Sequence, residues 1–177
     1  MKVLTLLRHA KAGAELATMR DFDRPLVPRG RRGARLIGRE MKALGLGFDS
    51  VLASPAARTA QTVTEVESEF GPLHADYDQR LYLADLHTLF EIVHETLDEV
   101  DRLLLVGHNP GIEMLALSLG GQESPAMRQS VASKYPTATL AQIALEPEQW
   151  MDVVPGSGRI ARFIRPRDLD PELGPED

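Results

Sequence analysis

Apolar residues in this chain fall into short runs that alternate with longer amphipathic segments. The runs near residues 3–7, 51–53 and 103–106 are almost entirely apolar, which is typical of strands buried on both faces of a sheet. Looser patterns predict strands at 137–145 and 160–164, with a brief one at 153–154. Residues 73–82 fit either a short strand or a loop.

Between these strands, apolar residues recur at helical spacing. The predicted helices cover residues 30–44, 54–66, 86–100 and 112–119. Ser54-Pro55 and Asn109-Pro110 are helix-start signals, because the first side chain caps backbone N–H groups and proline fits the first helical position. Residues 12–28 are predicted as a loop, as are residues 122–136, with or without a helical turn.

The order of these elements predicts the fold class. Strands and helices alternate from residue 3 to about residue 119, which favours a parallel sheet covered on both faces. The later strands follow without long helices between them and suggest one antiparallel member. We therefore expect an α/β protein with three α/β/α layers and a mostly parallel central sheet. A single domain over residues 1–169 is predicted, and the acidic segment 170–177 is expected to fray.

Composition narrows the function classes. The chain has 177 residues, no cysteine and a formal net charge of −6. The lack of cysteine excludes disulfides, cysteine-ligated zinc and thiol catalysis, and the negative charge argues against general nucleic-acid binding. No apolar run reaches the ~18 residues of a membrane-spanning helix, and no signal-peptide pattern precedes the first strand. We expect a cytoplasmic protein without a nucleic-acid or membrane partner, whose oligomeric state stays open.

Candidate chemistry gathers where predicted strands end. Arg8 and His9 follow the first strand, and His108 follows the strand at 103–106. Arg58 falls in the first turns of the helix after the strand at 51–53. Because ligands of open α/β sheets bind at the carboxyl ends of the strands, these side chains are expected to share one crevice. Arginine offers a planar fork of donors for phosphate oxygens, and histidine is a nucleophile near neutral pH.

Other polar residues have simpler interpretations. Thr59 and Thr62 fit plain helix surface. His87 and His94 fit exposed helix surface as well, because neither has a partner at a spacing that indicates a metal site. Several arginines between residues 29 and 39 fit a solvated helix face, although a basic rim that steers anions is the alternative. The sequence has no Gly-Lys-Ser/Thr phosphate loop and no paired-carboxylate motif for magnesium, so neither a metal nor a cofactor is predicted.

Four motifs in order carry a family resemblance over roughly residues 1–169. Leu7-Arg8-His9-Ala10 resembles the Arg-His signature of the histidine phosphatase superfamily, which has the phosphoglycerate mutase-like fold. Ser54-Pro55 with Arg58, Thr59 and Thr62 is similar to its second motif, and Gly107-His108 to its late histidine motif. Asp23-Arg24-Pro25-Leu26, Gly107-His108-Asn109-Pro110-Gly111 and Tyr135-Pro136-Thr137 resemble the SixA-type phosphohistidine phosphatases within it.

The resemblance implies roles for particular residues. His9 would be the nucleophile that becomes phosphorylated, while Arg8, Arg58 and His108 would hold the transferring phosphoryl group. Ser54 joins these three as an expected substrate-binding residue. The implied activity is a metal-independent phosphatase acting on a phosphorylated substrate, with a phosphohistidine-bearing protein as the expected partner. A broad phosphomonoesterase and a non-catalytic phosphate-binding sensor remain the alternatives.

Two departures from the family pattern refine this expectation. Many members have Gly and then Glu after the Arg-His pair, whereas Ala10 and Lys11 follow here, which argues against mutase activity. Many also carry a glutamate that protonates an alkoxide leaving group, but residues 78–85 contain none. SixA-type members lack that acid as well. Whether Asp78 or Asp85 replaces it is left open by the sequence.

Overall fold

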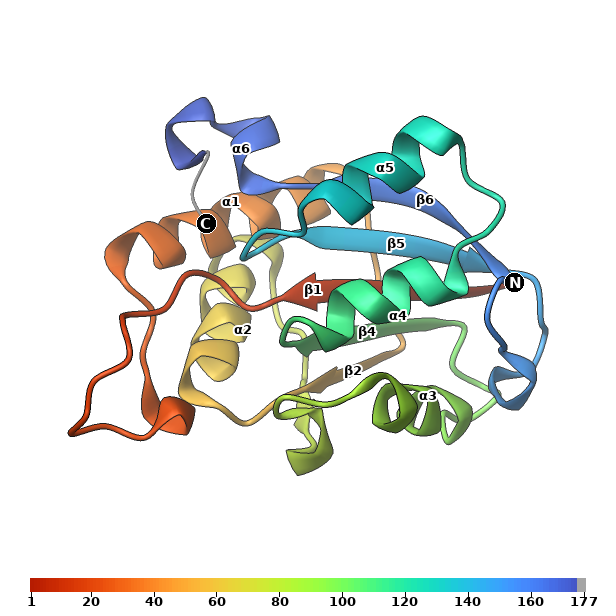
Figure 1. Cartoon of the computed structure of the whole chain (residues 1–177), viewed down its shortest axis with the longest axis horizontal. Helices are drawn as coiled ribbons and strands as arrows, with labels where there is room; N and C mark the ends of the chain where they lie inside the picture. The colour runs from red at the N-terminus through yellow and green to blue at the C-terminus, as the bar shows by residue number, and fades with distance from the viewer. Residues whose placement is uncertain (175–177) are drawn as a thin grey trace.

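The computed structural model describes residues 1–174 and places a six-stranded sheet between two layers of helices (Figure 1). The strands are β1 (Lys2–Arg8), β2 (Ser50–Ala53), β3 (Asp76–Tyr77), β4 (Arg102–Gly107), β5 (Leu140–Leu145) and β6 (Gly158–Ile164). The α-helices are α1 (Pro28–Ala43), α2 (Ala57–Phe70), α3 (Leu86–His94), α4 (Gly111–Leu119), α5 (Pro125–Ser133) and α6 (Pro166–Leu169). The short 3-10 helices are η1 (Asp21–Asp23), η2 (Gln79–Leu81), η3 (Trp150–Asp152) and η4 (Pro171–Leu173).

The strand order is β3-β2-β4-β1-β5-β6. β1, β2, β3 and β4 pair in parallel, and β5 pairs antiparallel with both β1 and β6. Within the described chain, β5 alone therefore runs against the others. This confirms the predicted three-layer class with a mostly parallel sheet and one antiparallel strand.

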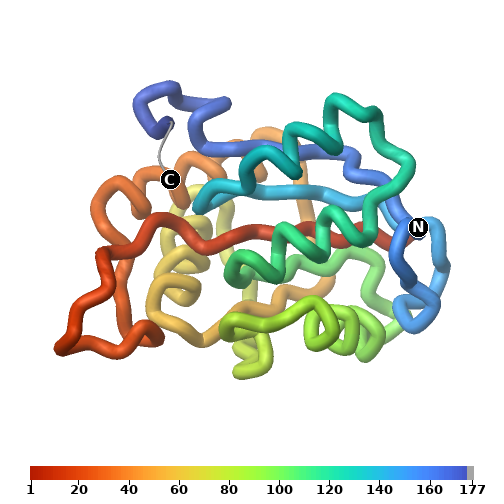
Figure 2. The backbone as a smooth tube through the Cα atoms, viewed as in Figure 1, coloured from red at the N-terminus to blue at the C-terminus, as the bar shows by residue number. Residues whose placement is uncertain are grey.

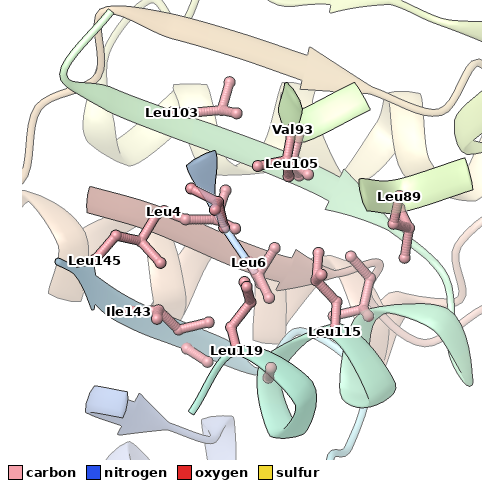
Figure 3. Packing of buried hydrophobic residues seen from close by; sticks show 14 of the residues in the cluster. Leu4, Leu6, Leu89, Val93, Leu103, Leu105, Leu115, Leu119, Ile143 and Leu145 are labelled. Carbon is pink, nitrogen blue, oxygen red and sulfur yellow. The ribbon is translucent and has the colours of Figure 1, made fainter. Parts of the chain in front are cut away.

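Alternation along β4 shows why the sheet is covered twice. Leu103 and Leu105 belong to a core cluster that includes residues of α3 and α4 (Figure 3). Leu104 and Val106 belong to a second cluster with residues of α1 and α2. All four side chains are fully buried, and burying one such side chain stabilises the fold by roughly 1.5–3 kcal/mol. A strand that packs against helices on both faces of the sheet must therefore be apolar at every position.

Helices α1 and α2 pack closely beside each other. A Cβ atom on Gly38 would lie 2.6 Å from the carbonyl oxygen of Val66, so only glycine permits this approach. Arg31 and Arg35 of α1 both pair with Glu65 of α2. The expected solvated face of α1 is therefore partly a set of ion pairs between helices.

Three sequence predictions differ from the structure. Residues 125–133 form the helix α5, whose first turn is capped by the Ser124 hydroxyl, rather than a loop. Residues 153–154 are not a strand: Val153 is the C-cap of the 3-10 helix η3, and its N–H donates to the carbonyl of Trp150. The helix predicted over 86–100 ends at His94, so Leu97 is 70% exposed instead of lying on the buried stripe. In each case the hydrophobic pattern pointed to one element, and the residues that form turns or helix caps set another.

The expected single domain ends at Leu169, the last residue of α6. In the segment expected to fray, Pro171–Leu173 form the turn η4. Residues 175–177 lie outside the described chain. The predicted fraying therefore stays a prediction.

Candidate active site

Three neighbouring strands, β1, β4 and β2, place side chains at their carboxyl ends, on one side of the sheet. Arg8 lies opposite Gly107 in the β1–β4 pairing, and Ala53 lies opposite Val106 in the β2–β4 pairing. His9, Ser54 and His108 come within one residue of these positions. The loop between β1 and α1 runs out beyond this side of the sheet and returns along it (Figure 2). The structure thus brings the ends of these strands together, as the sequence predicts.

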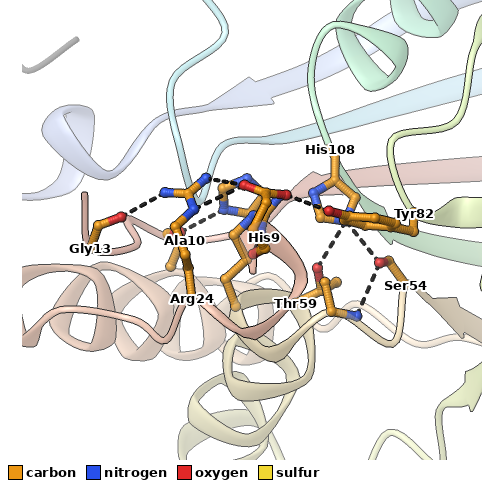
Figure 4. Close-up of polar contacts among 11 residues, drawn as sticks. His9, Ala10, Gly13, Arg24, Ser54, Thr59, Tyr82 and His108 are labelled. Carbon is orange, nitrogen blue, oxygen red and sulfur yellow. Dashed lines mark hydrogen bonds and ion pairs between the residues drawn. The ribbon is translucent and has the colours of Figure 1, made fainter. Parts of the chain in front are cut away.

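His9 is held in one tautomer. Its Nδ1 lies 2.7 Å from the carbonyl oxygen of Ala10, which can only accept, so Nδ1 carries the proton (Figure 4). Nε2 then bears the lone pair. The backbone N–H of Ala10 donates to the Thr62 hydroxyl at 2.9 Å, which fixes the acceptor carbonyl in turn. His9 is only 8% exposed, so the ring has little freedom.

His108 faces His9, with ring centroids 5.1 Å apart. Its Nε2 lies 2.8 Å from the Ser54 hydroxyl and 3.3 Å from the Thr59 hydroxyl (Figure 4). Its Nδ1 is buried and has no hydrogen-bond partner among the described residues.

This geometry corrects two sequence interpretations. Ser54 neither caps α2, whose N-cap is Ala56, nor lines the pocket; it is fully buried behind His108. Thr59 and Thr62 are also fully buried rather than exposed helix surface. The hydroxyls of Ser54 and Thr59 contact His108, and that of Thr62 accepts from the backbone N–H next to His9. None of the three residues lines the pocket, so the structure does not place Ser54 for the direct substrate contact that was expected.

Two arginines flank the histidines. Arg58 is only 2% exposed, and its two terminal nitrogens donate to the main-chain oxygen and the carboxylate of Asp21 at 2.8 and 3.0 Å. Its Nε has no partner among residues 1–174. Arg8 donates from Nη1 to the carbonyl of Tyr135 at 2.9 Å and lines the same pocket.

Sequence analysis missed Asp21 and Tyr82. Both oxygens of the Asp21 carboxylate are used: Oδ1 accepts from Arg24 at 2.9 Å, and Oδ2 accepts from Arg58 and from the Tyr82 hydroxyl at 2.5 Å. The Tyr82 ring stands edge-on to His108 at 5.4 Å. Asp21 lies in a long loop between the predicted elements, and no periodicity points to it.

These groups surround an open pocket of about 760 Å³. The lining residues include Arg8, His9, Lys11, Arg58, His108 and Asn109, together with the carboxylates of Glu15 and Asp21. With Arg24, four cationic side chains outnumber the two carboxylates. Such a cavity suits an anion that is smaller than the pocket and carries several negative oxygens.

Asp78 and Asp85 are absent from this pocket. Asp78 accepts from the backbone and side chain of Arg80, and Asp85 caps α3 by accepting from the N–H of Thr88. These hydrogen bonds lower the pKa of each carboxyl below its ordinary value. Neither residue is placed or protonated to act as an acid at His9.

Burial controls the protonation of both histidines. It lowers the pKa of His9 from 6.5 to about 3, and the charges of His108, Arg8 and Arg58 add to this effect against the Ala10 hydrogen bond. It also lowers the pKa of His108 to about 3, aided by the charge of Arg58. Both rings are therefore neutral at pH 7, as a nucleophilic His9 requires.

We expect acid to destabilise the fold through these rings. Between pH 6.5 and pH 3 the unfolded chain binds protons that the folded chain excludes, so stability falls as the pH falls through this window. From pH 7 to pH 5 the loss should be roughly 1–2 kcal/mol for each histidine. Urea unfolding at the two pH values measures it. His9→Gln should lose less stability than the wild type, and an equal loss in both would contradict the expectation.

Two absences concern the described residues alone. No group of three His, Asp or Glu side chains within residues 1–174 is arranged to hold a metal ion. None of the helices in this part of the chain has the length and apolarity to cross a membrane.

Comparisons with known proteins now identify the family. The model of the histidine phosphatase superfamily (branch 1) matches residues 4–88, which include Arg8, His9 and Arg58. An uncharacterised protein of Mycobacterium tuberculosis is 36% identical over 164 residues, covering 91% of this chain and 100% of that relative. The chain belongs to the histidine phosphatase superfamily.

Solved structures of this superfamily share the phosphoglycerate mutase-like fold. A protein of Agrobacterium tumefaciens, provisionally named phosphohistidine phosphatase SixA, matches with a TM-score of 0.78 and 28% identity, covering 92% of this chain and 97% of that one. A protein of Nakamurella multipartitia with the same provisional name matches with a TM-score of 0.79 and 26% identity, covering 93% and 96%. These matches extend beyond residue 88 and so cover most of the fold.

Proposed function

We propose that this protein hydrolyses phosphohistidine through a covalent intermediate on His9. The observation that carries the proposal is that a histidine of fixed tautomer shares its pocket with two residues that each have a buried nitrogen without a partner among the described residues. Arg58 Nε and His108 Nδ1 lack partners among the described residues, and leaving such groups unpaired is costly. Phosphoryl oxygens would satisfy them. The provisional names of the Agrobacterium and Nakamurella proteins support the same substrate class.

In the first step His9 Nε2 attacks phosphorus. The other ring nitrogen of the substrate carries a proton from solvent, so when the bond from phosphorus to the imidazole nitrogen breaks and its electron pair returns to that nitrogen, neutral imidazole leaves. Arg8, Arg58 and His108 face the three equatorial oxygens, where negative charge spreads in the transition state. Because the Ala10 carbonyl holds the nucleophile's Nδ1 proton, His9 needs no separate base.

In the second step water attacks the phosphorus of phospho-His9. The bond between Nε2 and phosphorus breaks, the ring regains its lone pair, and inorganic phosphate leaves with the oxygen of the water, whose protons stay on the phosphate or pass to solvent. The arginines again stabilise the equatorial oxygens. The required positive charge comes from side chains of this chain, so we propose that neither step needs a metal ion.

The carboxylates near the site favour phosphohistidine over alkyl phosphates. Burial alone would raise the pKa of Asp21, but hydrogen bonds from Tyr82, Arg24 and Arg58 bring it well below its usual range. Asp21 is therefore ionised and donates no proton. Imidazole leaves without such help because its own pKa is near 6.5.

Two peptides of one sequence test the proposal, one carrying phosphohistidine and the other phosphoserine at the same position. The wild-type protein should release phosphate from the first at a kcat/KM at least roughly 10²-fold higher, because only the second needs a general acid. EDTA should leave both rates unchanged.

Each alternative function has its own outcome. Equal rates would favour a broad phosphomonoesterase. Phosphate binding without turnover of either peptide would favour a sensor. Activity that EDTA removes and magnesium restores would contradict the metal-free mechanism.

A further inference from the structure

Asp21 accepts hydrogen bonds from three side chains, two of which come from distant parts of the chain. Arg24 lies in its own loop, Arg58 in α2, and Tyr82 follows η2. Arg58 contacts this residue twice, through the main-chain oxygen and through Oδ2. The Arg24 guanidinium also donates to the carbonyl of Gly13, which ties the loop to itself (Figure 4). The Asp21 carboxylate lines the pocket that contains His9.

These contacts explain how Arg58 tolerates burial. A guanidinium that is 2% exposed needs a counter-ion, and Asp21 supplies it. Both terminal nitrogens of Arg58 are thereby oriented, while Nε stays unsatisfied. The orientation is set before any ligand arrives, which is the condition for effective charge stabilisation in a transition state.

The same carboxylate opposes a bound phosphate. Asp21 carries a negative charge in direct contact with an arginine assigned to the phosphoryl group, and this charge repels a bound phosphate in the same pocket. A site selected only for tight anion binding would not place a carboxylate there. Weaker binding of the product, however, speeds its release.

We propose that Asp21 is a positioning residue that fixes Arg58 for phosphoryl transfer and lowers the affinity of the site for inorganic phosphate. This inference rests on the proposed function, because it assigns Arg58 to the phosphoryl group. A purely structural role for Asp21 in the loop predicts something different. Loosening the loop would weaken catalysis and phosphate binding together, whereas the proposal has them change in opposite directions.

Asp21→Asn tests the difference, because the amide keeps the shape and one acceptor but removes the charge. We expect kcat to fall by about tenfold or more, and inorganic phosphate to bind about tenfold more tightly. Isothermal titration with phosphate and turnover of the phosphohistidine peptide measure the two quantities. Asp23→Asn is the matched control, since Asp23 lies in the same loop and pairs with the exposed Arg20. It should change neither quantity.

Tyr82→Phe provides a second variant that keeps the ring against His108 and removes one donor to Asp21. We expect phosphate affinity in this variant to stay close to that of the wild type, because the charge on Asp21 and both of its contacts to Arg58 remain. Phosphate affinity that falls or stays constant in Asp21→Asn overturns the proposal.

Failure of the proposed function shows separately. If the wild type binds phosphate but cleaves no phosphohistidine, the substrate assignment fails. The titrations then still decide whether Asp21 restrains phosphate binding.

Discussion

Replacing His9 with alanine is expected to lower the rate of phosphate release by roughly 10⁴-fold or more, as removal of a covalent nucleophile does in other enzymes. No other described group fits this role. The Nε2 of His108 is engaged by the Ser54 hydroxyl and the charge of Arg58 acts on its ring, so we assign His108 to holding a phosphoryl oxygen and not to attacking phosphorus. His9 alone combines a fixed Nδ1 proton with a position directly after Arg8.

Labelling shows whether the lost activity reflects a lost covalent step. Rapid quenching of the wild type at alkaline pH, followed by peptide mapping, should place phosphate on the peptide that carries His9. His87→Ala is the control, since the His87 side chain lies on the exposed surface of α3, where it pairs with Glu91. It should leave both label and rate unchanged. Label on His108 together with an active His9→Ala variant would refute the assignment.

The convergence of Arg8, His9 and His108 could be predicted from the sequence, because the position of a residue in a parallel sheet follows from the hydrophobic pattern. An apolar run that stops at Arg8 and His9 marks a strand end, and a second run that stops before His108 marks another. The rule that parallel strands present these ends at one edge then brings the residues together. Arg58 follows the same logic through the helix after β2.

The support around these residues was not accessible in that way. Ser54-Pro55 carries a helix-start signal, yet the helix begins at Ala57 and the hydroxyl turns to His108. A serine hydroxyl before proline can cap a helix or bond to a distant side chain, and the local sequence does not show which of the two it does. Asp21 and Tyr82 are 61 residues apart and meet through a loop with no periodicity. Only three-dimensional contacts reveal that they share Arg58.

Hydrolysis of simple phosphate esters is expected to depend steeply on the pKa of the leaving group. Expelling an alkoxide requires a proton in the transition state, and general acid catalysis there is worth about 10² to 10⁴ in rate. Asp78 and Asp85 are engaged in capping their own turns, and Asp21 is held ionised by three donors. None of these three aspartates is therefore positioned and protonated for this purpose, which leaves Glu15 as the other carboxyl group that lines the pocket.

The expected order of kcat/KM is phosphohistidine first, aryl phosphates second and alkyl phosphates last. A series of substituted phenyl phosphates measures the slope of log kcat/KM against leaving-group pKa, and alkyl phosphates extend it. Asp78→Asn and Asp85→Asn should leave that slope unchanged, because neither residue lines the pocket. Glu15→Gln is the more demanding test. Glu15 lines the pocket together with Asp21, and of these two carboxylates it is Asp21 that pairs with Arg58. A flat slope in the wild type that becomes steep in Glu15→Gln would identify Glu15 as the missing acid. The preference for phosphohistidine would then lose its physical basis, because a pocket that can protonate an alkoxide has no reason to discriminate against phosphate esters.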